Sequence, residues 1–320
     1  MEQGTARLRY PFIMMHRRHF LATSLGALTV STLPVPAIPP VARRGASRMQ
    51  LGVAAYSFRQ FFQWSRDKKQ PPVEGRKPWS ITDFVDWCAD HKVPGAEVTS
   101  YFFPPDVDKA FLLEIKRQAY LRGVQLAGTA VGNNFALPKG VKLDAEIAYV
   151  KKWIDHAAIM GAPHIRLFAG PQPKELSREE AMENCLEAWQ GCLDYAAGKG
   201  VFLGMENHGG IVAEPENLLK LVEAARSPWA GINLDSGNFH TEDPYADLAK
   251  IAPFAVNVQL KVEIRRAGSD APEPTDIPRV LEILRAANYQ GWFILEYEKK
   301  DDPFVEVPRL VNLLKPLLDP

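Results

Sequence analysis

The sequence has no excess of either charge and very little cysteine. Lysine plus arginine number 38, and aspartate plus glutamate also number 38, so no overall field attracts nucleic acid or an anionic membrane surface. The three cysteines, Cys88, Cys185 and Cys192, are too few for a disulfide framework and lack the spacing of a metal site. We therefore interpret them as buried small residues and expect a small, neutral or weakly charged ligand.

Glycine-rich nucleotide-binding loops are also missing. No Gly-x-Gly-x-x-Gly follows the first predicted strand, and no phosphate-binding loop occurs elsewhere in the chain. These absences disfavour a doubly wound open sheet that binds a dinucleotide or a nucleoside triphosphate.

The N-terminal apolar run, residues 22–33, is too short for a comfortable membrane span of about 20 residues. It follows Arg17-Arg18 and Phe20-Leu21 and precedes a proline-rich stretch. This order resembles a twin-arginine export signal. We expect residues 1–45 to be that signal with its linker, and the mature chain to be periplasmic, with a membrane tether only if the signal is not cleaved. A flexible arm that happens to contain two arginines is the alternative.

The remaining sequence alternates between strand-like and helix-like segments. Strands are predicted at 50–58, 95–99, 124–130, 164–169, 201–208, 231–238, 255–261 and 292–298, and helices at 81–91, 106–122, 144–160, 176–199, 215–225, 244–251, 277–287 and 305–318. Eight alternations over roughly 275 residues fit a single (β/α)₈ TIM barrel, which typically has about 250. We predict this barrel for residues 46–320. The long connection 59–79 is expected to be a structureless lid or insertion at the carboxyl ends of the strands.

Four successive predicted strands each bring one oxygen-bearing side chain to their carboxyl end. These side chains are Glu206, Asp235, Gln259 and Glu296. Because the carboxyl ends of barrel strands surround a single mouth, the four are expected to converge. Three carboxylates and an amide, without a thiolate, suit a divalent cation such as Mg²⁺ or Mn²⁺.

The phrases around these residues resemble a known family. They are Gly-Met-Glu-Asn-His-Gly-Gly at 204–210, Leu-Asp-Ser-Gly-Asn at 234–238, Val-Gln-Leu-Lys at 258–261 and Ile-Leu-Glu-Tyr-Glu at 294–298. Together they resemble the xylose isomerase-like superfamily, near the ketose 3-epimerases, hydroxypyruvate isomerases and inosose dehydratases. The resemblance implies one divalent metal held by Glu206, Asp235, Gln259 and Glu296, with Mn²⁺ or Mg²⁺ favoured over Zn²⁺ or Co²⁺.

One of these places departs from the family. Gln259 stands where the family commonly has histidine, and Val262 replaces the acid that follows the retained Lys261. An amide oxygen is as neutral as imidazole and keeps the charge of the site, but the change also fits a weakened or abandoned metal site. The nuclease branch of the superfamily needs several extra histidines, whereas this chain has 7, two of them within the predicted signal.

The chemistry that the resemblance implies is proton transfer next to a carbonyl. Glu206 and Glu296 are the expected acid/base pair, with the metal stabilising the enediolate. Further candidates for substrate binding are His208, Lys261, Asn238, Arg265, Glu97, Asn133 and Tyr56. The alternative for Lys261 is a lysine at a strand end that reaches solvent. The alternative for Glu97, Asn133 and Tyr56 is a structural role through hydrogen bonds. His164 opens its strand and is placed at the opposite face of the barrel.

Three functions fit these residues. The first is a metal-dependent sugar isomerase or epimerase, the second is a keto-sugar or keto-inositol dehydratase on the same site, and the third is a non-catalytic, exported carbohydrate-binding barrel. The expected partner is a small-molecule sugar or keto-sugar, without nucleic acid or a stable membrane span. A homo-oligomer is compatible with the sequence.

Overall fold

The computed structural model describes residues 38–318, which belong to a single compact unit. The predicted export signal lies almost wholly in residues 1–37, outside the described residues, and stays a prediction. None of the described helices is both long and apolar enough to cross a membrane.

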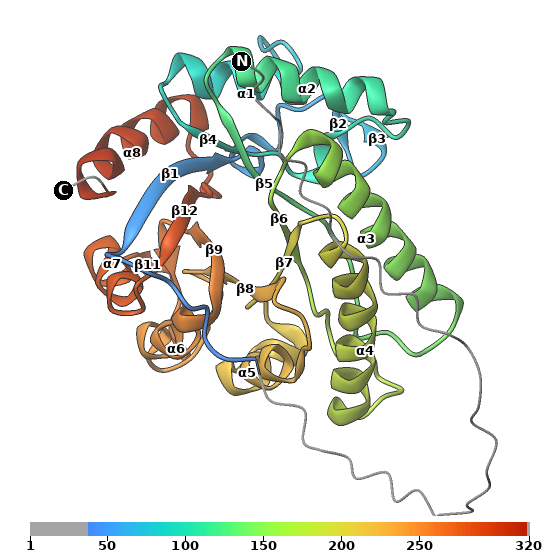
Figure 1. The fold of residues 1–320 in the computed structure, drawn as a ribbon. Coiled ribbons are helices and arrows are strands. Elements are labelled where there is room, and N and C mark those ends of the chain that lie inside the picture. Colours follow the sequence, from blue (N-terminus) through green and yellow to red (C-terminus); the bar gives the residue numbers. More distant parts are fainter. Residues whose placement is uncertain (1–37, 319–320) are drawn as a thin grey trace, which may run out of the picture. The chain divides into compact units, whose positions relative to one another are not determined.

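A closed sheet of eight parallel strands forms the centre of this unit (Figure 1). Its strands, in their order around the barrel, are β1 (Arg48–Ala54), β12 (Gln290–Leu295), β9 (Ala255–Leu260), β8 (Ala230–Asp235), β7 (Phe202–Glu206), β6 (His164–Leu167), β5 (Gln125–Ala130) and β4 (Gly95–Glu97), which closes on β1. This confirms the predicted TIM barrel. The first strand is shorter than predicted, because Ala55–Phe58 forms a 3-10 turn.

Within residues 38–318, eight α-helices surround the sheet. They are α1 (Ile81–Asp90), α2 (Lys109–Leu121), α3 (Val141–Met160), α4 (Arg178–Ala197), α5 (Pro215–Ala224), α6 (Pro244–Ile251), α7 (Ile277–Ala286) and α8 (Pro303–Leu318). Capping boxes at Ser80 and Ser177 confirm the predicted starts of α1 and α4. Helix α4 ends earlier than predicted, with Gly198 as its C-cap, while Gly200 has a φ of +70° in the turn that follows. The three cysteines are buried and free, as predicted.

Residues 38–47 lie against the barrel rather than forming a free linker. The Ile38 amide donates to the Glu223 carbonyl, and the Val41 amide donates to the Pro253 carbonyl. The Arg43 guanidinium lies 5.0 Å from the centre of the Tyr289 ring. The chain is therefore attached to the barrel before β1 begins.

Glycines make room for large side chains inside the barrel. A Cβ atom at Gly204 would lie 2.4 Å from Nε2 of His164, and one at Gly128 would lie 3.2 Å from its Nδ1. His164 is the first residue of β6, as predicted, and is buried with no hydrogen-bond partner for either ring nitrogen among the described residues. It fills the interior on the side away from the strand ends that carry the site.

The buried ring of His164 is expected to make the protein sensitive to acid. Burial, with a smaller contribution from Arg166, lowers its pKa from 6.5 to about 3. The unfolded chain therefore binds one more proton than the folded chain between these pH values, and stability falls as pH decreases through that window, by up to about 1.4 kcal/mol per pH unit.

The test compares denaturant unfolding of wild type and His164→Gln from pH 7 to pH 4. The wild type should lose stability more steeply than the variant, while His240→Gln, at an exposed histidine, should follow the wild type. Parallel curves for wild type and His164→Gln would contradict the prediction.

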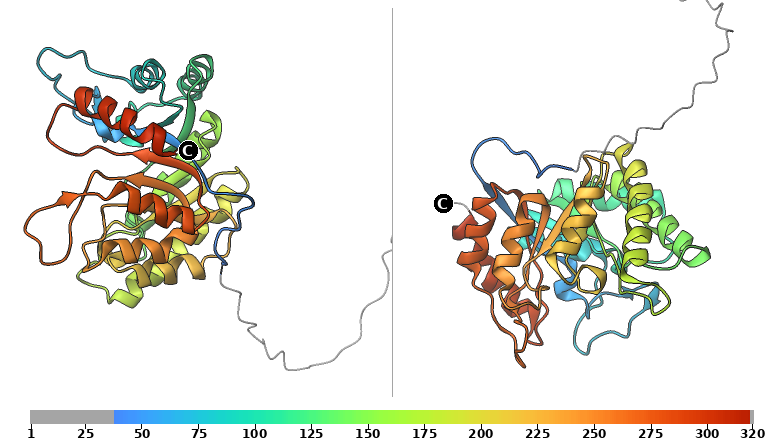
Figure 2. Two further views of the ribbon diagram at one scale, coloured as in Figure 1. Left: turned by 90° about the vertical axis from the view of Figure 1, so that its left-hand side faces the viewer. Right: turned by 90° about the horizontal axis from the view of Figure 1, so that it is seen from below.

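The connection 59–79 is not structureless, so that part of the prediction is wrong. It contains a hairpin of β2 (Trp64–Ser65) and β3 (Lys68–Lys69), and Phe62 is buried with its ring stacked on Phe102 at 4.2 Å. A second hairpin, β10 (Glu263–Ile264) and β11 (Glu273–Pro274), projects from the barrel in orange in Figure 2. Whether residues 59–79 act as a lid stays a prediction.

Candidate active site at the carboxyl ends of strands β7, β8, β9 and β12

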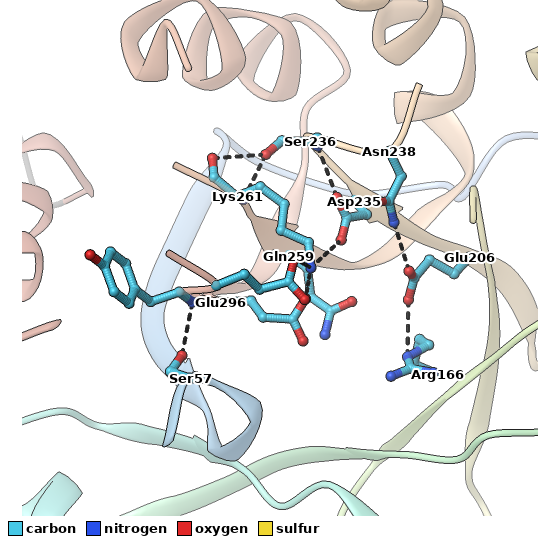
Figure 3. Close-up of polar contacts among 12 residues, drawn as sticks. Ser57, Arg166, Glu206, Asp235, Ser236, Asn238, Gln259, Lys261 and Glu296 are labelled. Carbon is cyan, nitrogen blue, oxygen red and sulfur yellow. Dashed lines mark hydrogen bonds and ion pairs between the residues drawn. The ribbon is translucent and has the colours of Figure 1, made fainter. Parts of the chain in front are cut away.

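The four predicted residues converge at the carboxyl ends of neighbouring strands (Figure 3). Glu206 and Asp235 are the last residues of β7 and β8, Gln259 is the last but one of β9, and Glu296 directly follows β12. All four are buried, with at most 4% of any residue exposed. Asp235 pairs with Gln259 in the register of β8 and β9, which places the two side by side.

Local hydrogen bonds fix the strand ends that carry Glu206 and Asp235. The Asn207 side chain accepts from the Asp235 amide at 2.8 Å and donates to the Asp235 carbonyl at 2.9 Å. The Asp235 Oδ1 atom accepts from the Gly237 amide at 2.8 Å, an Asx-type turn. The neighbouring strands are thus locked together where their carboxylates emerge.

Lys261 directly follows β9 and lies among the carboxylates. Its Nζ atom contacts Glu296 Oε2, lies 2.9 Å from Glu298 Oε2 and 3.6 Å from Asp235 Oδ2. Only 12% of its side chain is exposed. The alternative of a lysine reaching solvent is therefore wrong.

Both oxygens of Glu206 have charged or polar partners. Oε2 lies 2.9 Å from Nε of Arg166, which is itself 4% exposed, and Oε1 accepts from Asn238 Nδ2 at 2.9 Å. The Arg166 guanidinium also lies 4.0 Å from the centre of the Phe168 ring. Figure 3 shows Glu206 directed toward Arg166 and Asn238, whereas Lys261 reaches toward Asp235 and Glu296.

A row of amides continues across the barrel from Glu206. Asn257 donates to Asn233 at 2.8 Å, and Asn233 donates to Gln259 Oε1 at 2.7 Å and to Glu206 Oε2 at 3.2 Å. Gln259 in turn donates to Glu97 Oε1 at 3.1 Å. The Gln259 carbonyl is thus engaged by an amide, and its amino group faces a carboxylate.

The carboxyl groups of the site have pKa values shifted in different directions. Burial raises the pKa of Glu206 to about 7 against the opposing effect of Arg166, and burial with the nearby Glu296 raises that of Glu97 to about 8. Burial also raises the pKa of Asp235. Burial alone would also raise the pKa of Glu296. Lys261 and Arg166 outweigh this effect, so the pKa of Glu296 lies below its ordinary value.

The other predicted substrate residues differ in how close they come to this centre. His208 lies at the mouth with its ring 4.2 Å from that of Phe168, and Tyr56 is half-buried beneath the Arg59 guanidinium. Asn133 exchanges two hydrogen bonds with the backbone of Phe168. Arg265 is exposed just after β10, and no contact among residues 38–318 joins it to the carboxylates.

Sequence reasoning missed Arg166 as a site residue. It lies two residues after His164 on β6 and therefore points to the same face, into the barrel. An arginine at an inward position near the carboxyl end of a barrel strand is a signal that the sequence contained.

A cleft of about 540 Å³ is lined by residues other than Glu206, Asp235, Gln259 and Glu296. Tyr101 lines this cleft, and its hydroxyl lies 3.5 Å from Nη1 of Arg166. Arg66, Gly132, Tyr149 and Trp153 are among the residues that line it. Aromatic rings with a few charged groups are a typical lining for a small-molecule pocket of this size.

The predicted four-ligand metal site does not fit this arrangement. Asp235 Oδ2 has no hydrogen-bond partner among the described residues, which alone would favour a cation. However, the Gln259 oxygen is engaged by Asn233, Glu206 by Arg166 and Asn238, and Glu296 by Lys261. No three His, Cys, Asp or Glu residues within 38–318 are arranged to hold a metal ion.

The positive charge of Lys261 also disfavours a metal ion among these residues. Two unit charges about 4 Å apart interact by about 4 kcal/mol at an effective dielectric constant of about 20, so a divalent ion among these carboxylates would be repelled by Lys261 by about twice that. Metal ligation by these residues stays a prediction.

Residues 85–316 match the Xylose isomerase-like TIM barrel family, and the chain belongs to that family. No curated protein matches it by sequence. Solved structures match in fold: a D-tagatose 3-epimerase-like protein has 16% identity and a TM-score of 0.66, with 85% of this chain and 98% of that one covered.

Two further solved structures are similar. The 3-keto-D-glucoside 4-epimerase from E. coli has 13% sequence identity and a TM-score of 0.60, and the match covers 84% of this chain and 100% of that one. The probable 3-DHS dehydratase from Bacillus anthracis has 13% sequence identity and a TM-score of 0.61, and the match covers 83% of this chain and 99% of that one. At these identities the similarity shows the fold alone.

Proposed function

We propose that the chain is a sugar isomerase or epimerase that moves a proton next to the carbonyl group of a keto-sugar. The observation that carries this proposal is the placement of two buried carboxylates, Glu206 and Glu296, at one barrel mouth with the Lys261 ammonium beside Glu296. A base, an acid and a fixed positive charge are the groups that enolisation requires.

The roles of the two carboxylates follow from their surroundings. Glu296, held in its charged form by Lys261, removes the carbon-bound proton, and the electron pair of the broken C–H bond moves to the carbonyl oxygen to form an enediolate. Glu206, whose raised pKa favours the protonated form, returns a proton to carbon. Two carboxyl groups with pKa values driven apart are typical of an acid/base pair.

The carbon that receives the proton decides the product. Protonation of the same carbon from the opposite side gives the epimer. Protonation of the neighbouring carbon, with transfer of the hydroxyl proton between the two oxygens, gives the isomer. Asn233 and Asn238 hold Glu206 in place for this step, and Asp235 Oδ2 is available to a substrate hydroxyl.

The names of the similar structures support a keto-sugar as the substrate class, since two are an epimerase and an epimerase-like protein. The cleft beside Tyr101 offers room for the part of the substrate that does not react. His208 and Phe168 supply a ring surface at the mouth.

The test is incubation of the purified chain with a panel of ketoses and keto-glycosides in D₂O, followed by NMR. Deuterium at the carbon next to the carbonyl, in a sugar of changed configuration, is the expected result. Loss of water with formation of an unsaturated ketone would instead assign a dehydratase. Sugar binding without deuterium uptake for any member of the panel would identify a carbohydrate-binding barrel and refute the proposal.

A further inference from the structure

We propose that the Lys261 ammonium takes the place predicted for the divalent cation, so that this chain binds and enolises its keto-sugar without a metal ion. This inference rests on the proposed function. It makes Lys261 a catalytic residue, whose positive charge holds the carbonyl oxygen of the substrate and stabilises the enediolate oxygen.

The position of Lys261 is built into the fold. Its backbone amide donates to Ser236 Oγ at 2.9 Å, which ties the start of the residue to the end of β8. A Cβ atom at Gly237 would lie 2.7 Å from both Cβ and Cγ of Lys261, so the glycine leaves the space through which the lysine stem passes. The side chain is therefore directed into the site by its neighbours rather than lying there by chance.

The Lys261 ammonium is surrounded by carboxylates, as a bound metal ion would be. It contacts Glu296, lies 2.9 Å from Glu298 and lies 3.6 Å from Asp235, and these carboxylates come from β8 and from the segment after β12. Two of them belong to the predicted metal quartet. A second cation between Asp235 and Glu296 would have to displace this one.

The other half of the predicted quartet is engaged elsewhere. Glu206 is paired with the buried Arg166, and Gln259 bridges Asn233 and Glu97 through both ends of its amide. A glutamine in this place accounts for the bridge, because it can accept from Asn233 and donate to Glu97 at once. The departure from the family histidine is thus part of a different, hydrogen-bonded arrangement.

The ammonium can perform the electrostatic part of the reaction. Breaking the C–H bond transfers the proton to Glu296 and the electron pair to the carbonyl oxygen, and the resulting negative charge is balanced by Lys261 without an added cofactor. Glu296 loses its own charge in the same step, so Lys261 exchanges one anionic partner for another. Reprotonation of carbon by Glu206 then restores the carbonyl.

The test measures Mn²⁺ binding to the chelator-treated full chain by electron paramagnetic resonance and by the Mn²⁺ dependence of the melting temperature. The wild type is expected to bind no stoichiometric Mn²⁺ and to melt at the same temperature with and without it. Lys261→Met and the milder Lys261→Gln leave Asp235 and Glu296 without their cation and are expected to gain one Mn²⁺ and to melt higher in its presence.

The matched control is Lys250→Met. Lys250 also pairs with two carboxylates, Glu216 and Asp247, but lies on the outer helix α6 with 47% of its side chain exposed. It is expected to gain no Mn²⁺ site. Gln259→His combined with Lys261→Met should bind Mn²⁺ more tightly than Lys261→Met alone.

Stoichiometric Mn²⁺ binding by the wild type, or folded Lys261 variants that bind no Mn²⁺, would overturn the inference. The titration needs no substrate, so its failure is separate from that of the proposed function, which only the deuterium experiment decides. If wild-type turnover is observed, it is expected to be unchanged by chelator and by added Mn²⁺.

Discussion

Glu296→Gln and Glu206→Gln are each expected to lower the turnover number by about 10²–10⁴-fold, the usual contribution of a general acid or base. Each change keeps the size and an oxygen acceptor but removes the group that takes or gives the proton. The Michaelis constant should change far less than the turnover number, because the amide can still hydrogen-bond the substrate.

Glu298→Gln is the matched control. Glu298 contacts the same ammonium, at 2.9 Å, but 43% of its side chain is exposed at the rim. Its replacement should alter turnover only a few-fold. The measurement is steady-state kinetics on the sugar that takes up deuterium, together with the exchange rate in D₂O. Near-wild-type turnover for both Glu→Gln variants would remove these carboxylates from the mechanism.

Much of the barrel could be predicted because its signals are local. Ser80 and Ser177 cap the helices that they precede, and Gly161, with a φ of +80°, ends α3 as predicted. Strand parity also worked inside the barrel: Asn233 and Asp235 face the site together, as do Asn257 and Gln259. Such signals depend only on residues that are close together in the sequence.

The β2–β3 hairpin was missed for a local reason. Its two turn residues, Arg66 and Asp67, have φ values of +50° and +63°. Turns of this kind usually contain Asn-Gly or Asp-Gly, because these residues adopt positive φ at low cost. An arginine in this conformation gives no such signal, and its guanidinium lies 4.0 Å from the Tyr101 ring centre instead.

The arrangement of the site could not be predicted because it depends on contacts across the barrel. Gln259 is oriented by Glu97, which lies 162 residues earlier in the sequence, and Glu206 is paired with Arg166 on the adjacent strand. Residue types at strand ends indicate that a polar site exists. They do not indicate which carboxylate meets which cation, and this decides whether a metal fits.

At alkaline pH, where Glu206 is charged, Arg166→Met is expected to destabilise the protein by about 3–5 kcal/mol, because it leaves the buried carboxylate without its partner. The side chains of Arg166 and Glu206 are 5% and 3% exposed, and 2.9 Å separates their charged groups. The free energy of unfolding in denaturant measures the loss. Without the arginine the pKa of Glu206 rises further above 7, so the deficit should narrow as pH falls toward about 7 and stay constant below it, where the carboxyl is protonated in both proteins.

The double variant Arg166→Met with Glu206→Gln identifies the cause of the loss. It removes both charges, so it should recover a large part of the stability that Arg166→Met loses. Arg122→Met is the surface control: Arg122 pairs with Asp86 and Asp90 at 40% exposure and should cost at most about 1 kcal/mol. If Arg166→Met costs no more than Arg122→Met, or if the double variant recovers nothing, then the buried ion pair does not hold Glu206 in the site.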